Sequence, residues 1–206
     1  MQHSSPVQIF HQYLPSASIP YCLDLWKRYP FELKLRNPRA TKVGDYCARH
    51  GRKAVITINK DLYPFLFLVT YIHEFSHHAV NIVYGNLPDA HGKEWKLAFK
   101  TFMGPVMDMN LFPPDLQAGL VRHLKNPKAS SFSDPLLTSL FRKHDPQSQN
   151  HLLLSHIKEG NVFLLNGKHF RKGPLQRTRI LCVEIKTGKK YLVPKDAEVD
   201  DLPVSA

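Results

Sequence analysis

The most marked feature of the hydrophobic pattern is a nearly continuous apolar segment between Leu62 and Tyr84. Its few polar positions do not mark out one side, so the pattern predicts a long helix that is buried almost all round. Pro64 is tolerated in a first helical turn, and Gly85 is typical of a helix C-terminus. The segment nevertheless carries two histidines and a glutamate, which are costly to bury without a partner.

Shorter periodic segments flank this helix. Gly104 and Pro105 are expected to end the helix that follows it. A small sheet ahead of the apolar helix, with helices around both, predicts an α+β domain over residues 1–126. The amphipathic helix patterns cover 7–13, 19–29, 93–102 and 113–125, and the strand patterns cover 31–36, 43–49 and 54–58.

The composition changes after residue 126. Proline, serine and glutamine become frequent, which predicts a linker over 127–156 that holds a short helix around 136–141. A small β-module over 157–206 follows. It is predicted from two hairpins, one over 161–170 around Asn166-Gly167 and one over 179–193 around Thr187-Gly188.

A short motif inside the apolar helix carries the chemistry. His73 and His77 are four residues apart, so on a helix they lie on one face and can share one cation. Glu74 lies between them and can reach a water molecule near the cation without being a ligand. This is the H-E-x-x-H pattern of zinc metallopeptidases.

A catalytic zinc ion takes three protein ligands and keeps one position open. The metzincin continuation needs glycine at position 80 and histidine at position 83, where Val80 and Val83 stand, so that subtype is excluded. His91 and Glu94 remain as candidates for the third ligand. We favour His91, because an imidazole just before Gly92 can turn back towards the first helix at the start of the next one.

The two motifs together resemble those of a known family. H-E-x-x-H at 73–77, followed by H-G-K-E-W at 91–95, is similar to the pattern of the SprT-like metallopeptidases, H-E-x-x-H and then H-G-x-x-[FW]. Segments 39–47 and 56–59 extend the similarity, which runs from about residue 7 to 125. The resemblance implies a zincin-like fold, hydrolysis of peptide bonds in protein substrates and an association with DNA. It also implies one zinc ion held by His73, His77 and His91, with Glu74 as the catalytic acid/base.

The charge balance is basic, with 28 Lys and Arg against 17 Asp and Glu, or +11. Such a balance favours polyanionic partners, or it keeps a protein in solution. Basic residues interleave with Phe170 and Tyr191 in the C-terminal module, which is typical either of a nucleic-acid surface or of a solvated sheet face. The predicted nucleic-acid contacts are Lys168, Arg171, Lys172, Arg177, Arg179, Lys189 and Lys190.

The three cysteines, Cys22, Cys47 and Cys182, are widely spaced and form no C-x-x-C pair. A disulfide framework is therefore not indicated. Many SprT-like proteins end in a zinc ribbon, and the C-terminal module resembles a degenerate ribbon without its cysteine ligands. Unpaired thiols, no signal-peptide pattern and no apolar run of membrane-spanning length predict a cytoplasmic protein that does not enter the membrane. The oligomeric state has no signal in the sequence.

Two hypotheses of different class follow. The favoured one is a zinc-dependent metalloendopeptidase of SprT-like type, because the ligands and the acid/base residue are all present. The alternative is a non-enzymatic nucleic-acid-binding or scaffold protein whose zinc site is structural or vestigial.

Overall fold

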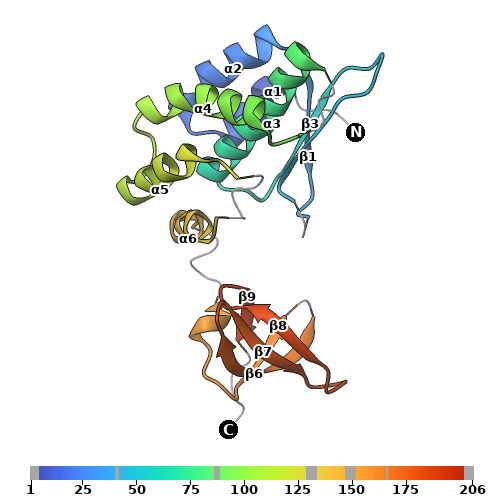
Figure 1. Cartoon of the computed structure of the whole chain (residues 1–206), viewed down its shortest axis with the longest axis vertical. Coiled ribbons are helices and arrows are strands. Elements are labelled where there is room, and N and C mark those ends of the chain that lie inside the picture. The colour runs from blue at the N-terminus through green and yellow to red at the C-terminus, as the bar shows by residue number, and fades with distance from the viewer. Residues whose placement is uncertain are drawn as a thin grey trace. The chain divides into compact units, whose positions relative to one another are not determined.

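The structure is a computed structural model that describes residues 5–39, 42–85, 89–128, 134–146, 152–165 and 167–201. The chain divides into two compact units, Met1–Phe141 and Arg142–Ala206, and each has a hydrophobic core of its own. The first unit combines helices with a three-stranded sheet, and the second is built on a six-stranded sheet (Figure 1). The predicted α+β class is confirmed. Among the described residues, no helix is long and apolar enough to cross a membrane.

In the first unit, a small sheet lies beside the longest helix. The central strand β3 pairs in parallel with β1 and antiparallel with β2, so β2 is an edge strand. The strands are β1 (Glu32–Arg36), β2 (Gly44–Cys47) and β3 (Val55–Asn59). The helical elements are α1 (Pro6–Tyr13), η1 (Ser16–Ser18), α2 (Ile19–Arg28), α3 (Pro64–Tyr84), α4 (Lys93–Asp108), α5 (Pro114–Lys125) and α6 (Pro135–His144).

Helix α3 is the predicted apolar helix. Every side chain from Leu66 to Ile72 is buried, because the sheet and other helices surround this part of the helix. Gly85 follows at φ 70°, a left-handed conformation that glycine adopts without strain and that ends the helix. The prediction of burial all round fails in the last turn, where Ile82, Val83 and Tyr84 are 51–69% exposed.

Helix α4 corrects the prediction that Gly104 and Pro105 end it. The helix continues to Asp108. Pro105 removes one helical hydrogen bond, but Met103 and Val106 are fully buried on the same helix. Burial of these side chains offsets the local signal, since each buried apolar side chain stabilises the fold by about 2 kcal/mol.

The first unit extends to Phe141, beyond the expected boundary at residue 126. The reason is α6, the short helix expected in the linker. Its Leu137 and Phe141 are buried in the first core, and Gly119 of α5 leaves room for Leu140 at a close approach of the two helices. The rest of the predicted linker includes 129–133 and 147–151, which lie outside the described residues.

The second unit contains the two predicted hairpins as a meander of β5 to β8. The last strand, β9, returns to pair with β5, and β4 pairs with β9. Asn166 of the first predicted turn lies outside the described residues. The elements are β4 (Leu152–Leu153), η4 (Leu154–His156), β5 (Val162–Leu165), β6 (Lys168–Gln176), β7 (Arg179–Glu184), β8 (Lys190–Pro194) and β9 (Glu198–Asp201).

Cys182 lies at the centre of the second core. It is fully buried with Phe163, Phe170 and Ile180, where it acts as a small hydrophobic residue. Within the described part of the unit, no group of three metal-ligating side chains comes together. The likeness of this module to a zinc ribbon stays a prediction.

Candidate metal centre

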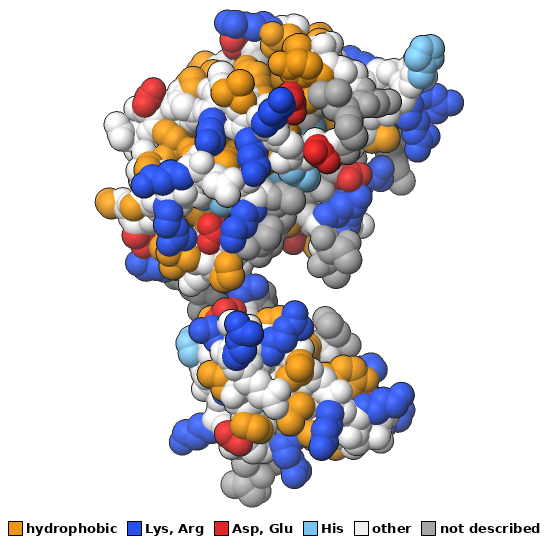
Figure 2. Space-filling model, viewed as in Figure 1, with side chains coloured by type: hydrophobic (Ala, Val, Ile, Leu, Met, Phe, Trp, Pro, Cys, Tyr) orange, Lys and Arg blue, Asp and Glu red, His pale blue; other side chains and the backbone are white. Residues whose placement is uncertain are grey.

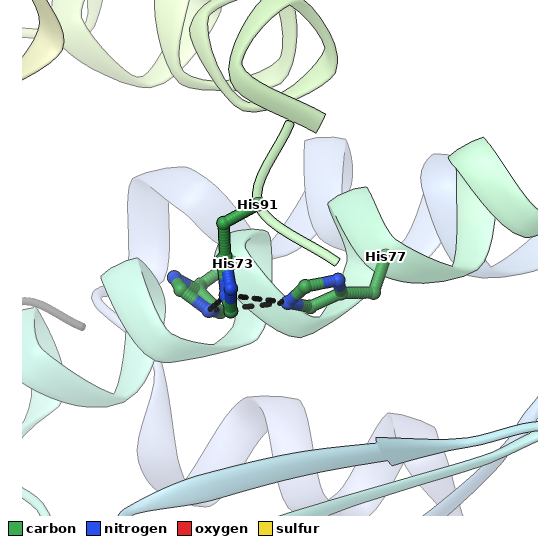
Figure 3. Close-up of side chains that lie close together, drawn as sticks. All are labelled: His73, His77 and His91. Carbon is green, nitrogen blue, oxygen red and sulfur yellow. Dashed lines mark hydrogen bonds between the residues drawn. The ribbon is translucent and has the colours of Figure 1, made fainter. Parts of the chain in front are cut away.

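Three histidines from two segments converge in the first unit (Figure 3). His73 and His77 lie one turn apart on α3, and His91 reaches them from the segment that leads into α4. The Nε2 atom of His77 is 3.3 Å from that of His73 and 3.1 Å from that of His91, and the third side of this triangle is 3.3 Å. The three nitrogens therefore face one common point.

The size of this triangle fits a tetrahedral metal ion. Metal–nitrogen bonds of about 2.0–2.1 Å place the ligand nitrogens about 3.3 Å apart. Burial holds the pKa of His73 well below its usual value, with the neighbouring histidines adding to the shift, and lowers the pKa of His77 to about 4. Burial also lowers the pKa of His91. The imidazoles are thus neutral at pH 7, the form that binds metals.

Trp95 of α4 supports all three imidazoles. Its ring centroid lies 4.6 Å from that of His73, 5.4 Å from His77 and 4.7 Å from His91. Its indole N–H donates to the main-chain carbonyl of His73 at 3.4 Å, and the ring of Phe99 stacks on the Trp95 ring at a centroid distance of 5.1 Å. The sequence signal for this role was the spacing of four residues between His91 and Trp95, which places His91 just before α4 and Trp95 in its first turn.

Glu74 lies on α3 between His73 and His77 but outside the group of three nitrogens. Its side chain is 7% exposed, and its Oε1 atom lies against β2, where a Cβ built on Gly44 would be only 2.5 Å away. Burial raises the pKa of Glu74 to about 8, and the charge of Asp45 adds to the shift. Glu74 is therefore a buried carboxyl group that holds a proton near neutral pH.

Tyr46 fastens the edge strand β2 to α3. Its hydroxyl donates to Asn81 Oδ1 at 3.1 Å and lies 3.4 Å from His78 Nδ1, while its ring is nearly parallel to that of His77. Burial raises the pKa of Tyr46 to about 12. Tyr46 thus fixes the strand on the side of the helix that carries His77.

Two further ionisable side chains near the site lie outside the group of three histidines. Glu94, the alternative third ligand, is outside the group of three and faces Lys93 with 3.8 Å between charged atoms. His78 is also outside the group and packs against Phe31. The structure therefore brings His91 to the two histidines of α3.

Three of the predicted nucleic-acid contacts form an ion pair or hydrogen bonds within the second unit. Lys168 pairs with the buried Glu184 at 3.1 Å. Lys172 donates to the main-chain carbonyls of Ser155 and Ile157, and Arg179 donates to a carbonyl of β8. These cations contribute to holding the module together.

The other predicted contacts are spread over the module. Arg177 lies in the turn from β6 to β7, whereas Lys189 and Lys190 lie at the turn from β7 to β8. These turns are at opposite ends of β7, about 17 Å of strand apart, and Arg171 is on the neighbouring strand β6. The register places Arg171 and Lys190 on either side of Val183, whereas Arg177 lies at the far end of β7, so the predicted contacts do not all form one patch and their role stays a prediction.

The chain was also compared with known proteins. Family models, curated proteins and solved structures gave no match to it.

Proposed function

We propose that this protein is a zinc-dependent metalloendopeptidase of SprT-like type, with a zincin-like first unit that hydrolyses peptide bonds in protein substrates. One observation carries the proposal. The Nε2 atoms of His73, His77 and His91 form a triangle of tetrahedral size, and a buried glutamate that is not a ligand lies on the same helix. The resemblance to SprT-like proteins supports the same assignment.

The number of ligands favours a catalytic site over a structural one. Structural zinc sites are closed by four protein ligands, whereas catalytic sites have three and leave one position open. Among the described residues the group contains three histidines and no cysteine or carboxylate. When bound there, zinc supplies Lewis-acid chemistry, which polarises a carbonyl group and lowers the pKa of water to about 7.

Glu74 is the proton carrier in this proposal. Its buried carboxylate accepts a proton from the attacking water and then donates it to the amine of the leaving peptide. Burial raises the pKa of Glu74 to about 8 in the metal-free chain, and the positive charge of a bound zinc ion would lower it again, so that the carboxylate form is present near pH 7 to take the proton. Contact with Gly44 limits the positions that the carboxylate can take.

Strand β2 is the proposed platform for the substrate. One of its edges pairs with β3, and within the described residues the other edge has no strand partner. An extended peptide can add to such an edge through main-chain hydrogen bonds. Because Gly44 lies against Glu74, a peptide on this edge lies beside the acid/base residue.

The test is Glu74→Gln beside the wild type, with zinc content by mass spectrometry and hydrolysis of an unfolded protein such as casein. The variant keeps one zinc ion per chain and loses at least about 100-fold in rate, the usual contribution of a general base. Glu94→Gln is the matched control and keeps both properties. An active Glu74→Gln protein contradicts the mechanism. A wild type that binds zinc and does not hydrolyse peptides favours the non-enzymatic alternative.

A further inference from the structure

The connection between β2 and β3 carries a concentrated positive charge. Arg49, His50, Arg52 and Lys53 all belong to the seven-residue loop 48–54, and all are exposed. Figure 1 shows this hairpin projecting past the helices of the first unit, and Figure 2 shows basic and histidine side chains gathered at its outer end. The loop is therefore a narrow basic tip, which we call the β2–β3 tip (residues 48–54).

A tight turn brings these side chains together. The amide of Arg52 donates to the carbonyl of Arg49 at 3.1 Å, and Gly51 adopts φ 70°. The ladder continues up to the pair formed by Cys47 and Val55, just below the tip. The tip is thus the end of a two-stranded ribbon and not a long open loop.

The charge of the tip is not compensated within the described structure. Among the described residues, no ion pair involves Arg49, Arg52 or Lys53. The sequence has no acidic residue between Asp45 and Asp61, and Asp45 is already paired with Lys42 at 2.8 Å. Three cations therefore lie close together in solvent, an arrangement with a self-repulsion that an anionic partner removes.

We propose that the β2–β3 tip binds the phosphate backbone of double-stranded DNA. Arginine donates paired hydrogen bonds to phosphate oxygens, and two of the cations are arginines. The major groove of DNA, about 12 Å wide, admits a two-stranded ribbon, whereas the major groove of duplex RNA is too narrow. The tip has no aromatic or large apolar side chain of the kind that forms the centre of a protein–protein interface.

The second unit offers a comparable tip at its β7–β8 turn, with Lys186, Lys189 and Lys190. That turn differs in having lysines only and in having the carboxylate of Glu184 at its base. Its point charges lack the paired donors of arginine, and the carboxylate reduces the local positive potential. The two tips therefore form a matched pair for an experiment.

DNA at the β2–β3 tip would lie near the metal centre. Strand β2 runs from the tip to Gly44, about 10 Å of strand, and Gly44 touches the position of Glu74. The binding itself requires no metal ion and no peptidase activity. The inference therefore stands or falls apart from the proposed function.

The experiment measures binding of the full chain to a fluorescent 20-base-pair DNA duplex over a range of salt concentrations. The variant Arg49→Ala/Arg52→Ala/Lys53→Ala is compared with Lys186→Ala/Lys189→Ala/Lys190→Ala, which removes the same charge. The first variant loses roughly 30-fold or more in affinity at 0.1 M salt. Its plot of log K against log salt becomes less steep, by about 2.7 in the slope, because three phosphate contacts are lost. The second variant changes affinity less than about threefold.

Further arms separate this proposal from its rivals. Arg49→Lys/Arg52→Lys keeps the charge and retains the salt slope, and unchanged thermal melting shows that every variant is folded. Equal losses in the two triple variants would show that only net charge matters, and a loss confined to the Lys186 variant would move the contact to the second unit. Poly-glutamate or duplex RNA that binds the β2–β3 tip as tightly as DNA also overturns the proposal.

Discussion

Each of the two units buries one glutamate, and the two glutamates differ in whether hydrogen bonds and an ion pair compensate the carboxylate. Glu74 in the first unit is 7% exposed and Glu184 in the second is 4% exposed. Glu184 accepts hydrogen bonds from Thr187 at 2.7 Å and Tyr191 at 3.1 Å, and it pairs with Lys168. These partners lower its pKa. The charge of Glu184 is therefore compensated by partners within the second unit.

Glu74 has no such partners among the described residues, and burial raises its pKa to about 8. A buried polar group without donors reduces stability, so its retention calls for a role outside folding. The comparison separates a glutamate that holds strands together from one that is available to bind and release a proton. The same contrast holds for metal ligands, because the first unit gathers three histidines while the second buries Cys182 in an apolar core.

Zinc content gives the largest expected effect. His91→Ala removes one of three ligands, so the zinc content of the purified protein falls from one ion per chain to near zero. Cys182→Ala, in the second unit, keeps one ion. Metal titrations can be followed by tryptophan fluorescence, because Trp95 lies against the three imidazoles. A second zinc ion, or one that Cys182→Ala removes, would contradict the assignment of the metal to the first unit.

The contributions of Glu74 and Glu184 to the folding stability should depend on pH in opposite ways. The pKa of Glu74 is raised in the folded state, so folding binds a proton between pH 4.5 and about 8, and stability is lost as the pH rises through that range. Metal-free Glu74→Gln is therefore more stable than the wild type by roughly 3–5 kcal/mol at pH 9, with no difference at pH 4. Urea unfolding followed by tryptophan fluorescence measures this in the first unit, which contains both Trp26 and Trp95.

The matched variant in the second unit is Glu184→Gln. The pKa of Glu184 is lowered by Thr187 and Lys168, so its charge stabilises the fold above pH 4.5 and this stabilisation is lost as the pH falls. Glu184→Gln is therefore less stable than the wild type at pH 7, and the difference shrinks in acid. Hydrogen exchange of the β6–β8 amides measures it. Equal pH profiles for the two variants would remove the contrast between the units.

The smallest effect concerns the space beside Glu74. A Cβ on Gly44 would be 2.5 Å from Glu74 Oε1 and 2.7 Å from Thr70 Cγ2, so Gly44→Ala destabilises the first unit by about 1–3 kcal/mol. It also slows hydrolysis while zinc is retained, because the carboxylate is displaced. Gly104→Ala in α4 meets no atom within 4 Å and is expected to stabilise the helix by about 1 kcal/mol. A harmless Gly44→Ala would show that Glu74 has room to move.

The sequence was sufficient to predict those features that depend only on residues close together in the chain. His73, Glu74 and His77 occupy one turn of a helix, so their relative placement follows from helical geometry. The hairpins of the second unit follow from turn residues and alternation in the same way. The strand β9 was missed, because its pairing with β5 closes a connection of more than thirty residues and leaves no local pattern.

The sequence by itself determined the H-E-x-x-H helix, the α+β class and a short choice between His91 and Glu94. The tertiary structure brings His91, the candidate that the sequence favoured, to the two histidines through the packing of α4 on α3. It also placed Trp95 against the imidazoles and Gly44 against Glu74, and it carried α4 past Pro105. These outcomes depend on contacts between segments far apart in the chain, where the free energy of burial outweighs the preferences of neighbouring residues.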